Sequence, residues 1–148
     1  MKKTDCLFCA IPGEQVLIEH PLALAKRDGY PVSKGHTLII PRRHVASFFE
    51  TTEEERLAML KLLDDAKVML DREHKPDGYN IGINNGAAAG QTVMHLHIHL
   101  IPRKRADLTE GQDWYEQVLD SRSRARLSAQ VLQRTVSRLR LAARHLGT

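Results

Sequence analysis

The stretch His95-Leu96-His97-Ile98-His99-Leu100-Ile101 is the most informative part of this 148-residue chain. Histidine and apolar residues alternate along it, which is typical of a β-strand whose two faces differ. Because successive side chains of a strand point to opposite sides, the three histidines are predicted to share one face. Imidazole titrates near neutral pH, attacks electrophiles and binds metals. This face is therefore the first candidate for a functional site.

The segments upstream of the histidine stretch predict more strands and one long helix. Four short apolar runs bounded by turn-forming residues are predicted to be strands: 16–19, 22–25, 36–40 and 79–84. Thr52 and Glu55 match the capping box that begins helices, and the helix should end before Pro76. Its expected apolar positions are Leu57, Leu60, Leu63, Ala66, Val68 and Leu70.

These elements favour the α+β class, with an antiparallel sheet of about five strands and one long helix packed on it. Most strand connections are too short for the crossovers that parallel strands need. We expect residues 1–106 to form the domain that holds the histidines and residues 107–148 to form a basic, helical C-terminal extension. Residues 121–148 contain seven arginines and no acidic residue, whereas residues 1–120 contain 15 Lys+Arg and 18 Asp+Glu.

Composition also narrows the environment and the partners. No run of about 18 apolar residues is present, so no membrane span is predicted. The start of the chain lacks the apolar core of a secretory signal, and a cytoplasmic location is expected. The arginine-rich tail has no aromatic residues interleaved for base stacking, which argues against nucleic-acid binding.

From the residues alone, three roles remain open for His95, His97 and His99. They could be buried histidines that satisfy backbone groups, although three on one face would need three sets of partners. They could bind a metal, since alternate histidines on a strand are a common ligand pair. One of them could also act as a nucleophile supported by its neighbours.

The histidine stretch resembles the His-φ-His-φ-His-φ-φ signature of the histidine triad superfamily, where φ is apolar. Five further segments resemble this family in the same order: 6–11, 28–32, 35–37, 40–44 and 90–93. The resemblance covers roughly residues 5–105, and several ordered segments are more specific than one short pattern. Within the superfamily, the chain resembles bacterial-type proteins and the fragile histidine triad, or diadenosine polyphosphate hydrolase, branch.

The resemblance implies a nucleotidyl hydrolase or transferase in which His97 attacks the α-phosphorus of a nucleotide. A covalent nucleotidyl-histidine forms, and water then cleaves it. A neutral imidazole can do this at pH 7 without losing a proton from the attacking nitrogen. His99 is expected to donate to a phosphate oxygen, which contributes about 3 kcal/mol in the transition state. His95 is expected to brace the strand.

Other roles follow from the resemblance by position. Asn84, Gln91 and Thr92 match phosphate contacts, and Asp28 matches a ribose-binding acid. His36 is expected near the leaving group. The walls of the base pocket are expected from Leu7, Phe8 and Ile11. Without the resemblance, Asp28 and Asn84 would be turn residues and the apolar residues would be core. Lys26, Arg27 and Arg103 could attract further phosphates or be surface charges.

The spacing Cys6-x-x-Cys9 is compatible with two reduced core cysteines or with part of a zinc site. Some bacterial histidine triad proteins, and the related galactose-1-phosphate uridylyltransferases, bind zinc through two cysteines and two histidines. The matching positions are Cys6, Cys9, His44 and His95. The resemblance therefore implies structural zinc.

We expect a homodimeric hydrolase that cleaves at the α-phosphate of an adenosine dinucleoside polyphosphate. The alternatives are an adenosine 5'-monophosphoramidase that uses the same triad and a non-catalytic nucleotide-binding protein. A hydrolase in which the three histidines hold a catalytic metal is a further alternative. The absence of an acidic residue nearby on the strand argues against it.

Overall fold

The computed structural model describes residues 5–107 of the chain. The predicted basic helical extension therefore lies almost entirely outside the described residues, and the boundary proposed at residue 106 remains a prediction. Within the described part of the chain, no helix combines the length and the apolar character that crossing a membrane requires.

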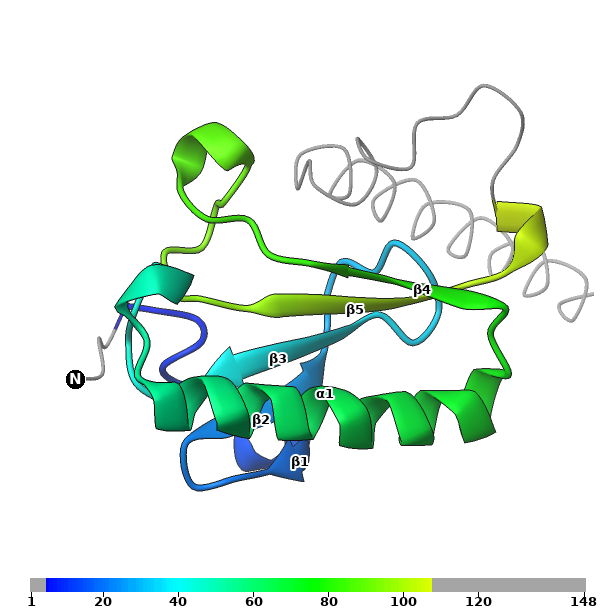
Figure 1. Ribbon diagram of the computed structural model, residues 1–148, viewed down its shortest axis with the longest axis horizontal. Helices are drawn as coiled ribbons and strands as arrows, with labels where there is room; N and C mark the ends of the chain where they lie inside the picture. The colour runs from blue at the N-terminus through cyan, green and yellow to red at the C-terminus, as the bar shows by residue number, and fades with distance from the viewer. Residues whose placement is uncertain (1–4, 108–148) are drawn as a thin grey trace, which may run out of the picture.

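The structure confirms the α+β class (Figure 1). Five antiparallel strands form one sheet in the order β1-β2-β3-β5-β4. Their bounds are Val16–Glu19 for β1, Ala23–Arg27 for β2, Thr37–Pro41 for β3, Gly78–Gly82 for β4 and Ile98–Arg103 for β5. The short connections β1–β2 and β2–β3 run between neighbouring strands. The 22-residue helix α1 (Glu53–His74) connects β3 to β4 and packs along the sheet.

Helix α1 covers one face of the sheet with a stripe that repeats every three or four residues. Its buried apolar side chains are Ala58, Met59, Leu62, Ala66 and Leu70. They pack against small and branched residues of the strands, among them Ala23, Ala25 and Ile39. The predicted stripe was partly wrong, because Leu57, Leu60 and Val68 are more than half exposed. A helix with apolar residues all round does not reveal from its sequence which side meets the sheet.

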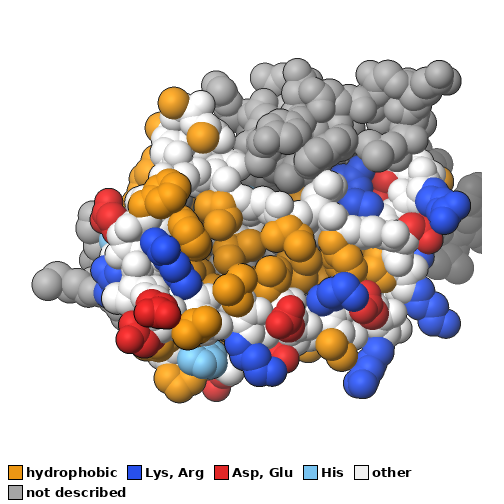
Figure 2. All heavy atoms as spheres, viewed as in Figure 1, with side chains coloured by type: hydrophobic (Ala, Val, Ile, Leu, Met, Phe, Trp, Pro, Cys, Tyr) orange, Lys and Arg blue, Asp and Glu red, His pale blue; other side chains and the backbone are white. Residues whose placement is uncertain are grey.

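Exposed apolar side chains of α1 and of the edge strand β4 gather on one face of the molecule. Figure 2 shows hydrophobic side chains gathered on this face. Leu60 of α1 and Ile81 of β4 are both more than half exposed. Among residues 5–107, β4 pairs with β5 alone, so its outer edge has no partner strand there. The homodimer expected from the sequence stays a prediction, and this edge is the place where a second sheet would add.

The opposite face of the sheet is covered by the N-terminal segment. Leu24, Leu38 and Ile40 form a second apolar cluster, and Phe8 and Ile11 pack against it. Side chains alternate along β2, so Ala23 and Ala25 face the helix while Leu24 faces the N-terminal segment. The candidate site lies on this second face.

The histidine stretch enters the sheet later than predicted. Strand β5 begins at Ile98, so His95 and His97 precede it. Continuing the register of β3 with β5 would place Leu96 opposite Pro41, whose carbonyl accepts from Nε2 of His95. The Leu96 N–H donates instead to the Val45 carbonyl, at 2.7 Å. The rings of His97 and His99 are adjacent, and the Phe8 ring contacts the rings of both His95 and His97.

The loop before β3 depends on one glycine. Gly35 has φ of +95°, and a Cβ at this position would lie 2.8 Å from the His74 ring at the end of α1. Only glycine accepts both the positive φ and this close approach. The loop that carries Asp28 and His36 is thereby held against the helix.

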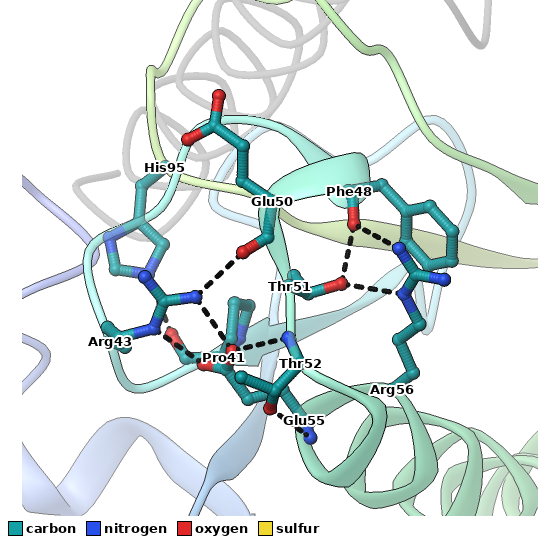
Figure 3. Close-up of polar contacts among 9 residues, drawn as sticks. All are labelled: Pro41, Arg43, Phe48, Glu50, Thr51, Thr52, Glu55, Arg56 and His95. Carbon is teal, nitrogen blue, oxygen red and sulfur yellow. Dashed lines mark hydrogen bonds and ion pairs between the residues drawn. The ribbon is translucent and has the colours of Figure 1, made fainter.

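A polar network fastens the start of α1 to the connection that leaves β3 (Figure 3). The predicted capping box is present: Thr52 Oγ1 accepts from the Glu55 N–H, and the Glu55 carboxylate accepts from the Thr52 N–H. The buried Glu55 carboxylate also accepts two hydrogen bonds from Arg43, at 2.8 and 3.1 Å. Arg43 donates as well to the Glu50 carbonyl. The network fixes the backbone next to His44.

We predict that Glu55→Ala lowers the free energy of unfolding by about 2 kcal/mol, because it removes a cap and a charge-assisted pair. The value is modest since the Arg43 side chain is 43% exposed and solvent screens its charge. Hydrogen bonds from Arg43 hold the pKa of the Glu55 carboxyl below its usual range. The stabilisation is therefore complete above pH ~4.3 and is lost as pH falls through the lowered pKa.

Urea unfolding of the wild type and of Glu55→Ala between pH 3 and 7 measures this difference. Glu54→Ala is the matched control, because Glu54 is an exposed acid in the same helical turn. An equal loss in the two variants, or a loss that does not shrink toward low pH, would contradict the assignment.

Candidate active site

A pocket of about 510 Å³ opens on the face of the sheet away from α1. It lies between the N-terminal segment, β2, β3 and the residues that precede β5. Six of the predicted site residues line it: Leu7, Phe8, Ile11, Asp28, Thr92 and His97. The structure thus brings together side chains that are up to 90 positions apart in the sequence. Five other predicted site residues do not line the pocket and lie around or behind it: Asn84, Gln91, His36, His95 and His99.

His97 is the histidine that reaches the pocket. Its Nδ1 lies 2.8 Å from the carbonyl oxygen of His95. A carbonyl only accepts hydrogen bonds, so in the neutral ring the proton is on Nδ1 and Nε2 carries the lone pair. The Phe8 ring packs on the imidazole in a T-shaped arrangement, with centroids 5.1 Å apart. The backbone therefore sets the tautomer that a nucleophilic imidazole requires.

His99 is fully buried beside His97, and its tautomer follows from a chain of hydrogen bonds. The Val32 N–H donates to Nδ1 of His36, at 3.1 Å, so neutral His36 carries its proton on Nε2. This Nε2 lies 2.9 Å from Nδ1 of His99 and 3.3 Å from the Asp28 carboxylate. His99 accepts at Nδ1 and consequently bears its proton on Nε2. The ring centroids of His97 and His99 are 4.9 Å apart.

His36 lies next to Asp28 and His99 and does not line the pocket. Its side chain is 1% exposed, and its expected role near a leaving group stays a prediction. Register explains its contact with Asp28: the Asp28 N–H donates to the His36 carbonyl, so the two residues are neighbours on adjoining chain segments. Asp28 acts as a turn residue, because its Oδ1 accepts from the Tyr30 N–H, and it also lines the pocket.

The loop after β4 is held by Gln91, whose amide contacts three backbone groups. Its Oε1 accepts from the Gly86 N–H, and its Nε2 donates to the carbonyls of Ala46 and Val93. The Gln91 side chain is buried in the loop and does not line the pocket, and the phosphate contact expected of this segment stays a prediction. Asn84 is likewise buried and donates to the Gly90 carbonyl, at 3.3 Å. Thr92 lines the pocket and is exposed.

Cys6, Cys9, His44 and His95 converge beside the pocket. Their ligand atoms all lie within 4.8 Å of one another. Sγ of Cys9 is 3.2 Å from Nδ1 of His44, and Sγ of Cys6 and of Cys9 are each 3.5 Å from Nδ1 of His95. Tetrahedral zinc with ordinary Zn–S and Zn–N bonds separates a sulfur and a nitrogen ligand by about 3.5 Å. The donor set and its spacing therefore fit a closed zinc site.

The surroundings of His95 support the same fit. Its Nε2 donates to the Pro41 carbonyl, at 2.7 Å, which directs the lone pair of Nδ1 toward the two sulfurs. Burial lowers the pKa of His95, so the ring is neutral as a ligand must be. Burial raises the pKa of the Cys6 thiol, and both cysteines are thiols, not a disulfide. A second group of possible metal ligands also converges, formed by Asp28, His36 and His99. In that group a hydrogen bond already joins the two histidine rings.

The pocket contains residues that the sequence interpretation missed or misplaced. Leu38, Gln15 and Tyr30 line it without having been predicted. Lys26 lines it too, whereas Arg27 lies on the helix face and pairs with Glu73, at 2.6 Å. Side chains alternate along β2 and on to Asp28. The sequence therefore already indicates that Lys26 points to the same side of the sheet as Asp28 and that Arg27 points to the other side.

Comparison with known proteins gives this site a family. Residues 12–106 match the model described as HIT domain. The chain is 35% identical to an adenosine 5'-monophosphoramidase of Schizosaccharomyces pombe over 114 residues, which are 74% of this chain and 83% of that protein. It is 34% identical to an asymmetrical bis(5'-nucleosyl)-tetraphosphatase of the same yeast over 106 residues, 72% of this chain and 58% of that protein.

Solved structures agree with this relationship. A Zn-bound histidine triad family protein from Mycobacterium smegmatis superposes with a TM-score of 0.64 and 31% identity, covering 85% of this chain and 97% of that one. The histidine row, the fold that carries it and these relatives together show that the chain belongs to the HIT domain family.

Proposed function

We propose that this chain hydrolyses a nucleotide at its α-phosphate through a covalent intermediate on His97. The observation that carries the proposal is the 2.8 Å contact of Nδ1 of His97 with the His95 carbonyl, inside the pocket. It leaves the lone pair of Nε2 as the attacking electron pair. HIT relatives named as nucleotide hydrolases support the same class of reaction.

The chemistry has two displacement steps. Nε2 of His97 forms a bond to the α-phosphorus while the bond from phosphorus to the leaving oxygen or nitrogen breaks. The positive charge on the ring is stabilised because Nδ1–H donates to a carbonyl oxygen. His99 can donate its Nε2 proton to a phosphate oxygen as charge develops there. Water then attacks phosphorus, the P–N bond returns its electrons to Nε2, and the proton of water passes to solvent.

The neighbouring residues prepare these steps without touching the reacting atoms. His36 fixes the tautomer of His99 through the 2.9 Å hydrogen bond, and Asp28 orients His36. Asp28 also lines the pocket, where its carboxylate can accept from ribose hydroxyls. Phe8, Ile11 and Leu38 supply an apolar slot for a base. Gln91 keeps the preceding loop in place through its three backbone contacts.

We propose a dinucleoside polyphosphate as the substrate, with a nucleoside phosphoramidate as the second candidate. Relatives named for each reaction match this chain at nearly the same identity, 34% and 35%. Both substrates present the same α-phosphate to His97 and differ only in the leaving group, which lies outside the triad. The adenosine base follows from the resemblance alone.

We predict that His97→Ala reduces turnover of diadenosine tetraphosphate and of an adenosine phosphoramidate about a thousandfold or more, because the nucleophile is lost. His99→Ala should slow the reaction and let one nucleotide accumulate on the protein. Intact mass after quenching without acid detects that adduct, and the faster of the two substrates identifies the reaction.

The control is His20→Asn, which changes a histidine in the β1–β2 turn that does not line the pocket. It should turn over like the wild type. Unchanged turnover in His97→Ala, or a steady absence of the adduct while turnover continues, would overturn covalent catalysis by His97.

We propose further that Cys6, Cys9, His44 and His95 hold structural zinc. When bound, zinc would supply a cross-link between the N-terminal segment, the connection after β3 and the chain two residues before His97. The convergence of four suitable ligand atoms within 4.8 Å supports this assignment. Closed sites of two cysteines and two histidines are structural and leave no position for substrate.

We predict about one zinc ion per chain in the purified protein, measured by elemental mass spectrometry, and a loss of most of it in Cys9→Ser. Removal of zinc by a chelator should lower the melting temperature, because binding energy of the ion is folding energy. The His97 adduct should still form in protein that remains folded. A wild type without zinc would contradict the site, and an adduct that vanishes with zinc in folded protein would favour catalytic metal.

A further inference from the structure

Lys26 is a charged residue without a protein partner inside a largely apolar pocket. It lines the pocket from β2, on the face that also carries Leu24 and Asp28. Among residues 5–107, its ammonium forms no hydrogen bond and no ion pair. It lies over the Phe8 ring, with Nζ 6.0 Å from the ring centroid. Its neighbour Arg27 has, in contrast, an acid, a hydroxyl and a carbonyl as partners.

The position of Lys26 separates it from the phosphate chemistry. Strand register places Lys26 opposite Leu38, and Leu38 opposite His99, so two strand spacings lie between Lys26 and β5. The Phe8 ring packs against the His97 ring, with centroids 5.1 Å apart, and its centroid is 6.0 Å from the Lys26 ammonium. An α-phosphate at Nε2 of His97 would therefore lie on the β5 side of the pocket, whereas Lys26 lines its β2 side.

The part of the pocket around Lys26 suits a planar base. Phe8, Ile11 and Leu38 line it with apolar surface, and the stem of Lys26 adds to that surface while the ammonium stays at its rim. An ammonium beside a bound base has three donors and no acceptor. It favours a base whose edge presents acceptors and disfavours one that presents an amino group.

We infer that Lys26 selects the base of the nucleotide and that the pocket prefers a 6-oxopurine, guanine or hypoxanthine, over adenine. Guanine presents two adjacent acceptors, N7 and O6, to a lysine, whereas adenine replaces O6 with an amino donor. This inference rests on the proposed function for the phosphate end and changes the base that the resemblance implied. It makes Lys26 a specificity-determining residue for the same site.

The test is titration calorimetry of the full-length protein with GMP, IMP and AMP. The wild type should bind GMP and IMP about tenfold more tightly than AMP, the size expected for one lysine contact to an oxo group. IMP shares O6 with GMP but lacks its 2-amino group, so equal binding of the two assigns the preference to O6 and N7. In Lys26→Met the preference should fall to about one.

Two further variants separate base recognition from general charge. Lys26→Arg keeps the donors and should keep the preference. Lys34→Met removes an exposed lysine of the loop beside the pocket, and it should change the three affinities equally. Because the measured quantity is a ratio of affinities, a uniform effect of lost positive charge on phosphate binding cancels.

The outcomes distinguish the two proposals. Binding of all three nucleotides with AMP as tight as GMP, or a preference that survives in Lys26→Met, would overturn the role of Lys26 and leave the hydrolase proposal standing. Failure of all three to bind the wild type would overturn the proposed function and this inference with it.

Discussion

The hydrogen bond between Nδ1 of His97 and the carbonyl of His95 gives one of three similar imidazoles a distinct chemical state. It depends on the backbone just before β5. The Pro41 carbonyl, which the β3–β5 register would place opposite Leu96, accepts from the His95 ring, and the Leu96 N–H donates to the Val45 carbonyl. The His95 carbonyl then accepts from a side chain two residues later. The chain therefore departs from regular strand pairing just before β5, where the His97 imidazole is oriented.

The other two histidines differ from His97 through their own neighbours. His95 donates a hydrogen bond from Nε2 to the Pro41 carbonyl, which directs its Nδ1 toward the two cysteines. His99 receives a hydrogen bond at Nδ1 from His36, whose own Nδ1 is occupied by the Val32 N–H. Backbone groups at both ends therefore set the tautomers of the whole row. Under the proposed function, His95 serves as a metal ligand, His97 as the attacking nitrogen and His99 as a donor, and none of these roles needs a charged residue in the row itself.

Much of this arrangement was predictable from local sequence. Alternation placed the three histidines on one side, and the pair Thr52 and Glu55 correctly located the start of α1. The four residues that converge as a zinc site also came from the family resemblance. The start of α1 is confirmed because it depends on a local helix cap, whereas the convergence of the four ligands supports the zinc site, which stays a prediction.

The predictions that failed depend on contacts between distant segments. The sequence of α1 did not reveal that Leu57 and Leu60 are exposed, because apolar residues occur on several sides of that helix. The contacts of His36 with Asp28 and His99 could not be read from the sequence, because strand register defines them and spacing does not. The three backbone partners of the Gln91 amide could not be read either, because they depend on the shape of its loop and on residue 46.

The tautomer of His97 is the most direct measure of how the site works. Nitrogen-15 NMR of the imidazole rings near pH 8, with the His97 signals assigned by their loss in His97→Gln, reports which ring nitrogen carries the proton. We expect His97 to be protonated at Nδ1 and His99 at Nε2. A proton on Nε2 of His97 would occupy the attacking lone pair and contradict the nucleophilic role drawn from this structure.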